Sequence, residues 1–185
     1  MLENFNPCFV LDLTATPKKE SNIISYVDAV QLKNEHMVKL PVIVYNRDSQ
    51  SEVLIDAIDL RNKLEEIASA EYAKTGKYIR PIALFQAQPK GKEDATTFEK
   101  LRDKLVDAGI PAEQIAIRTA DVNELKNVEL MSLSCPIRYI ITVNALKEGW
   151  DCPFAYILAS LANKTSQVDV EQILGRILRL PHTSQ

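Results

Sequence analysis

Runs of apolar residues alternate with segments of helical periodicity along most of the chain. Strand-like runs occupy residues 79–87, 115–117, 137–143 and 154–161. The last two runs are almost continuously apolar, which is typical of strands buried on both faces of a parallel sheet that helices cover. Strands that alternate with helical patterns indicate βαβ units. The pattern therefore predicts one α/β domain from about residue 50 onward.

Two amphipathic helices are expected between these strands. The first has apolar side chains at steps of three and four residues, at Val53, Ala57, Leu60, Leu64 and Ile67. Gly76 is a suitable residue to end it. The second has its apolar face at Phe98, Leu101, Leu105 and Ala108. Gly109 and Pro111 close this second helix.

Three other segments have a less regular pattern. Residues 8–13 read as a short buried strand that stops before Pro17, which lacks a backbone N–H. Residues 23–45 contain two strand-like pieces, 24–30 and 38–45, around a polar centre. Residues 119–135 fit either a loop or a helix.

The last predicted helix, about residues 166–180, separates its side chains into two faces. Gln172, Arg176 and Arg179 fall within an arc of about 60° at 100° per residue. The opposite, apolar face has Val170, Ile173, Leu174, Ile177 and Leu180. Arginines on an exposed face form weak surface ion pairs in many helices, but a guanidinium also matches the oxygens of phosphate.

The segment before this helix favours phosphate binding over surface ion pairs. Residues 145–153 (ALKEGWDCP) follow a buried strand directly, and ligands of parallel α/β sheets bind at the carboxyl ends of the strands. Gly149 allows a bend near a ligand, and Asp151 supplies an acceptor for a ribose hydroxyl or a cation-bound water. We therefore expect the two arginines to face the carboxyl edge of the sheet.

The amino-acid composition excludes some classes of structure and function. The 185 residues are 46% hydrophobic and carry a formal net charge of −3. Disorder is therefore excluded as the main description of the chain, and binding to nucleic acid through an overall positive charge is not expected. A local basic strip can still bind nucleic acid. No run of 18 apolar residues exists, so no membrane span is expected. The three cysteines are far apart, which argues against a zinc site and for free thiols in a reducing cytoplasm.

Three short segments, in order, resemble motifs III, V and VI of superfamily 2 helicases. They are TATP at 14–17, ALKEGWDCP at 145–153 and QILGRILR at 172–179. The middle motif most resembles the Res subunit of type III restriction enzymes. The resemblance implies a RecA-like fold: residues 1–17 would end a first motor domain, 18–50 would connect, and 51–185 would form the second, P-loop NTPase-like motor domain.

The resemblance also implies roles for individual residues. Arg176 and Arg179 would be arginine fingers that stabilise the charge developing in phosphoryl transfer. Nucleotide binding would involve Gln172, Gly149 and Asp151. Thr14 and Thr16 would couple the domains.

DNA contacts would come from Gln86, in a weak motif IV, and from Asn144. Many relatives have Thr-Asp where this chain has Val143 and Asn144. Thr142 stands one position early, and its role as a contact to the DNA backbone is therefore open.

This sequence lacks two motifs with which the family binds ATP: the phosphate-binding loop and the acidic motif that holds magnesium. It has no GxxxxGK[ST] and no DExH-like box before TATP. We therefore expect a fragment that is inactive alone, belonging to an ATP- and Mg²⁺-dependent cytoplasmic translocase. Its implied partners are double-stranded DNA and a Mod-like DNA methyltransferase subunit. The alternatives are a superfamily 2 helicase without a nuclease, or a non-catalytic module that binds nucleic acid or protein.

Overall fold

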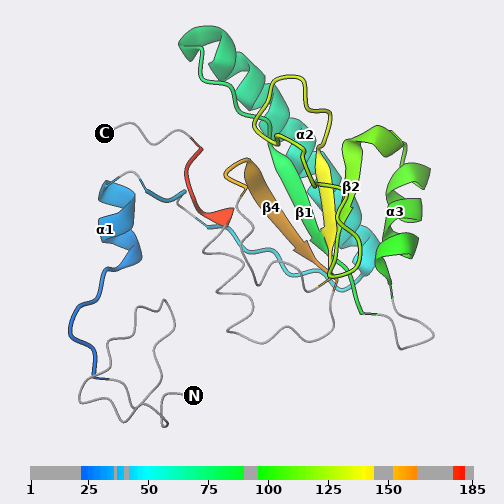
Figure 1. Cartoon of the computed structure of the whole chain (residues 1–185), viewed down its shortest axis with the longest axis horizontal. Helices are drawn as coiled ribbons and strands as arrows, with labels where there is room; N and C mark the ends of the chain where they lie inside the picture. Colours follow the sequence, from blue (N-terminus) through cyan, green and yellow to red (C-terminus); the bar gives the residue numbers. More distant parts are fainter. Residues whose placement is uncertain are drawn as a thin grey trace.

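The computed structural model describes residues 22–35, 37–39, 42–89, 96–143, 152–161 and 177–181 (Figure 1). Within these ranges the helices are α1 (Ala29–Asn34), α2 (Gln50–Thr75), α3 (Phe98–Asp107) and the short 3-10 helix η2 (Ala112–Gln114). The strands are β1 (Ile82–Gln86), β2 (Ile115–Arg118), β3 (Tyr139–Thr142) and β4 (Ala155–Ser160). Each of the four strands expected after residue 50 is present.

The four strands form one sheet in the order β2-β3-β1-β4. Every neighbouring pair is parallel, so the predicted α/β architecture with a parallel sheet is confirmed. The central strands β1 and β3 are buried at every position, as their continuous apolar sequences indicate.

Helices α2 and α3 cover the same face of the sheet (Figure 1). Leu54 and Ala57 of α2, with Leu101 and Leu105 of α3, form one core with Phe85 of β1. This face is closed by regular helical packing.

In the described part of the chain, the other face is covered mainly by irregular structure. Leu84 and Ile140 point to it and form a second core with Leu125, Ile137 and Ile177. The segment 119–137 is a series of turns, so its possible helix does not form. Its apolar residues lack a helical spacing, and it is held in place by the polar contacts of Arg80 instead.

Helix α2 starts at the cap Ser49 and ends at Gly76, as expected. Gly76 adopts the left-handed conformation with φ 70°, which suits glycine. The predicted apolar face was partly wrong: Leu60 and Ile67 are exposed, and Arg61 is buried instead. The guanidinium of Arg61 lies over the Tyr139 ring and pairs with Glu65. Arg61 therefore belongs to the buried face of α2, where the sequence pattern predicted apolar residues.

The segment before α2 differs from the predicted strand pieces. Residues 29–34 form α1, because Asp28 and Gln31 make a reciprocal capping box at its start. Residues 42–45 are not paired in the described part of the sheet, and their four large apolar side chains are all exposed. Both strand predictions in this region are therefore wrong for the described residues.

Candidate functional site

A row of polar side chains crosses the carboxyl edge of the sheet. Each strand ends on one of its members, and the strand register places them side by side: Arg118, Thr142, Gln86 and Ser160. They lie on the face opposite α2 and α3, because the side chains one position earlier in β2, β3 and β1 belong to the core beneath those helices. We call these four residues the polar row.

Two members of the polar row are joined to each other, and two keep buried atoms without a partner. Ser160 Oγ donates to Gln86 Oε1 at 2.9 Å. Thr142 is fully buried, and its Oγ1 has no hydrogen-bond partner. Arg118 donates from Nη1 to Asn123 at 3.2 Å, while its buried Nε has no partner. An N–H and a hydroxyl are both donors that suit an anionic oxygen, and these two belong to register partners on neighbouring strands, with both atoms buried.

A second hydrogen-bonded cluster fixes the start of α2 to the same edge. Gln88 Nε2 donates to the carbonyl of Leu161 at 2.8 Å, and its Oε1 accepts from the backbone of Thr96 at 2.9 Å. Thr96 Oγ1 donates to Gln50 at 2.6 Å. Buried polar groups that are satisfied in this way rigidify their surroundings. These hydrogen bonds therefore make the carboxyl edge of the sheet rigid.

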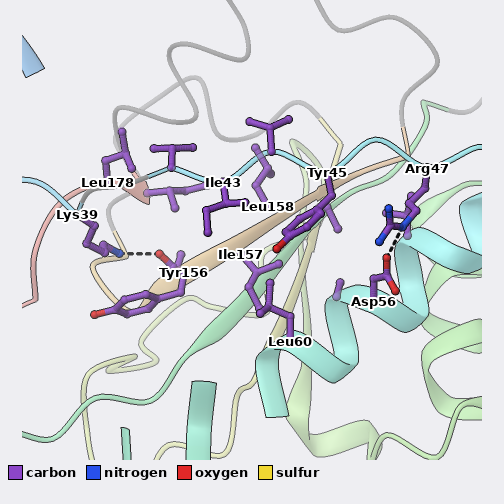
Figure 2. Close-up of a pocket in the computed structure, with 17 residues that line it drawn as sticks. Lys39, Ile43, Tyr45, Arg47, Asp56, Leu60, Tyr156, Ile157, Leu158 and Leu178 are labelled. Atoms are coloured by element: carbon purple, nitrogen blue, oxygen red, sulfur yellow. Dashed lines mark hydrogen bonds and ion pairs between the residues drawn. The ribbon is translucent and has the colours of Figure 1, made fainter. Parts of the chain in front are cut away.

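Lys39 forms a separate polar centre at the amino end of β4. Its Nζ donates to the carbonyls of Pro153 at 2.8 Å and Ala155 at 2.7 Å. It also lies 4.0 Å from the centre of the Tyr156 ring (Figure 2). Its backbone N–H donates to the carbonyl of Leu178 at 2.6 Å. Lys39 thus contacts the described ends of both segments, 145–153 and 172–179.

An apolar cavity of about 340 Å³ opens along the outer side of β4. Its walls are β4, the start of α2 and the segment 42–47, with Tyr45 and Leu158 among the lining side chains (Figure 2). Arg47 and Asp56 form an ion pair at 2.5 Å on this wall. The cavity can hold an apolar group, but its lining contains no arrangement of nucleophile and base.

Two of the site residues predicted from sequence are described. Gln86 is the last residue of β1 and is nearly buried; Arg179 is exposed, and its backbone pairs with Val38 in an antiparallel bridge. The other seven lie outside the described residues: Thr14, Thr16, Asn144, Gly149, Asp151, Gln172 and Arg176.

The structure does not bring Gln86 and Arg179 together, because they lie near opposite ends of β4. The chain leaves the carboxyl end of β4 at Leu161 and is next described at Ile177, near the amino end of the same strand. We expected the two arginines at the carboxyl edge of the sheet, and the backbone of Arg179 does not lie there. Arg118, Ser160 and Lys39 were missed by sequence reasoning. A polar residue at the end of each predicted strand was the available signal for the first two.

Cys152, in the segment 145–153, has an unreactive environment. Burial of the thiol raises its pKa to about 11, against weaker opposing contributions from backbone hydrogen bonds and from Lys39 and Arg80. The folded protein therefore keeps the neutral thiol, and the nucleophilic thiolate is suppressed.

We expect Cys152 to react with iodoacetamide far more slowly in the folded chain at pH 9 than in urea. Because the folded pKa is raised above the unfolded value, this group's contribution to stability is complete below about pH 9 and is lost as the pH rises toward about 11. Peptide mapping by mass spectrometry measures labelling at this residue separately from the other cysteines. Equal labelling rates in both states would contradict this prediction.

Comparison with protein-family models, with curated proteins and with solved structures gave no match to this chain. Among the helices of the described ranges, none is long and apolar enough to cross a membrane. The same part of the chain contains no group of three or more His, Cys, Asp or Glu side chains suited to a metal ion.

Proposed function

We propose that this chain is the second RecA-like motor domain of an ATP-dependent DNA translocase, of the kind found in the Res subunit of type III restriction enzymes. The proposal starts from the three sequence motifs at 14–17, 145–153 and 172–179. The parent protein would hydrolyse ATP with Mg²⁺ and act on double-stranded DNA beside a methyltransferase subunit. The phosphate cradle and magnesium ligands would come from a first motor domain.

The observation that supports the proposal is the order in which the motif segments and the strands follow one another along the chain. Gln86 ends β1, residues 145–153 come next after β3, and residues 172–179 come next after β4. These three strands are neighbours in one parallel sheet, so the chain leaves each of them at the same edge. The described ends of the segments 145–153 and 172–179, Pro153 and Leu178, come together at Lys39 near the amino end of β4.

In this proposal the polar row binds the sugar-phosphate backbone of DNA. Arg118, which is partly exposed, supplies a guanidinium to the phosphate, and the buried Thr142 and Gln86 lie beside it in the row. Phosphate contacts of this kind position a protein on DNA without reading its sequence. The recognition of a DNA site would then belong to the methyltransferase partner.

Arg179 would act from a different place than the sequence suggested. It lies on the flank of β4, beside the connecting segment 18–50 and not at the carboxyl edge. Its exposed side chain remains accessible to a nucleotide that a neighbouring domain presents. The proposed ATP site would thus lie between this flank and the first motor domain; Arg176 and Gln172, the other motif residues proposed for it, lie outside the described residues.

Turnover measurements test the proposal. The 185-residue chain alone is expected to show negligible ATPase activity and weak, salt-sensitive DNA binding, because only a few phosphate contacts are available. The longer protein that contains a Walker lysine motif is expected to hydrolyse ATP. Magnesium-dependent turnover by the chain alone, or the absence of a Walker lysine motif from the parent protein, would contradict the proposal.

A protein-interaction module is the second candidate. Ten of the 17 exposed large apolar side chains in the described ranges lie between residues 23 and 45, and such concentrations mark interaction surfaces. In this case the connecting segment would dock on another protein without any nucleotide chemistry. The Walker lysine distinguishes the two functions, because only the motor requires it.

A further inference from the structure

We propose that Lys39 is a positioning residue that fixes Arg179 relative to the end of the segment 145–153. The positioning stands on the described contacts, and its effect on catalysis rests on the proposed function. Lys39 belongs to the connecting segment, which contains none of the three motifs. It nevertheless contacts the described ends of two of them.

The side chain of Lys39 holds the start of β4. Its ammonium donates to two backbone carbonyls, of Pro153 and Ala155, at 2.8 and 2.7 Å. The Tyr156 ring lies 4.0 Å from the same nitrogen, so a cation–π contact adds to the two hydrogen bonds. Hydrogen bonds from a charged donor are about twice as strong as neutral ones. A half-buried ammonium with these partners has a defined position.

The backbone around Lys39 holds Arg179. The N–H of Lys39 donates to Leu178 at 2.6 Å, and the N–H of Leu180 donates to Met37 at 3.3 Å. The two hydrogen bonds flank Arg179, which pairs with Val38 between them. Any displacement of residues 37–39 therefore displaces the backbone of Arg179.

The connecting segment contacts the rest of the chain at two points. Lys39 holds it at the amino end of β4, and an exposed ion pair joins Arg47 to Asp56 in the first turns of α2. Between these two points, residues 42–45 enclose the apolar cavity (Figure 2). In the proposed motor, a movement of the connecting segment between the domains would reach Arg179 through Lys39.

Hydrogen exchange in the 185-residue chain tests the positioning. Lys39→Met keeps most of the apolar stem and removes the ammonium, whereas Lys39→Arg keeps a charge. We expect the Met variant to raise the amide exchange rates of residue 39 and Leu180 by about 10- to 100-fold, the size expected for losing a hydrogen bond to a charged group. The strands β1 and β3 should keep their protection. Lys63→Met, at an exposed position of α2, is the matched control.

Two exchange results would overturn the positioning. One is unchanged exchange at residue 39 and Leu180 in the Met variant. The other is an equal rise over the whole sheet, which indicates a general loss of stability. Partial or full restoration by Lys39→Arg supports the role of the charge.

The catalytic consequence is measured in the longer protein that includes a Walker lysine domain. Lys39→Met is expected to lower kcat about tenfold or more, with KM for ATP unchanged. Arg179→Ala is measured beside it. A normal rate for Arg179→Ala defeats the proposed function, whatever the exchange result. A low rate for Arg179→Ala with a normal rate for Lys39→Met defeats the positioning role.

Discussion

Replacing Arg80 by methionine is expected to lower the free energy of unfolding by about 3–5 kcal/mol, because buried acceptors that lose their donor cost about 1–3 kcal/mol each. Arg80 is only 1% exposed and lies directly before β1. It donates to the carbonyls of Ile137 at 2.9 Å and Ser132 at 2.8 Å, and also to that of Leu130. Methionine fills much of the volume but satisfies none of these carbonyls.

Urea unfolding followed by circular dichroism measures this loss. Arg102→Met is the matched control, since Arg102 forms an ion pair with Glu124 at 3.1 Å and both side chains are more than a third exposed. Exposed pairs contribute about 0–1 kcal/mol. Equal midpoints for the two variants would show that the segment 119–137 is held without Arg80.

The two buried arginines explain which parts of the fold were not predictable from sequence. The strands followed from long apolar runs, since burial on both faces leaves no polar positions. The burial of Arg61 and Arg80 was not predicted, because a charged residue is assigned to the protein surface when only the sequence is known. The distant carbonyls of residues 130–137 surround Arg80. Arg61 lies over the distant Tyr139 ring and pairs with Glu65, one turn further along α2.

The candidate site was recovered from sequence only in part, for a similar reason. Gln86, at the end of the predicted strand 79–87, was named only through its resemblance to a weak motif IV. Arg118 and Ser160 belong with it only through the strand order β2-β3-β1-β4 and its register, which local patterns do not contain. Lys39 reaches Ala155 across 116 positions of sequence, and a single lysine in a mixed segment gives no local signal of that contact.

Replacing Arg179 by alanine in the longer, Walker lysine-containing protein is expected to lower the ATPase rate by about 10³- to 10⁵-fold, the usual contribution of an arginine finger. Nucleotide affinity should change little, because an arginine finger stabilises charge that develops only in the transition state. Arg176→Ala is expected to act in the same direction. Single-turnover kinetics with separate measurement of nucleotide binding distinguish the two effects.

The lysine variant makes this test specific for the guanidinium. Arg179→Lys keeps the charge but loses the planar fork of donors, so it should recover only a minor part of the rate. Because Arg179 lies on the flank of β4 and is exposed, its alanine variant should leave the urea midpoint close to that of the unchanged protein. A normal ATPase rate in the alanine variant would assign Arg179 to a surface ion pair, since only a transition-state contact predicts loss of rate without loss of stability or affinity.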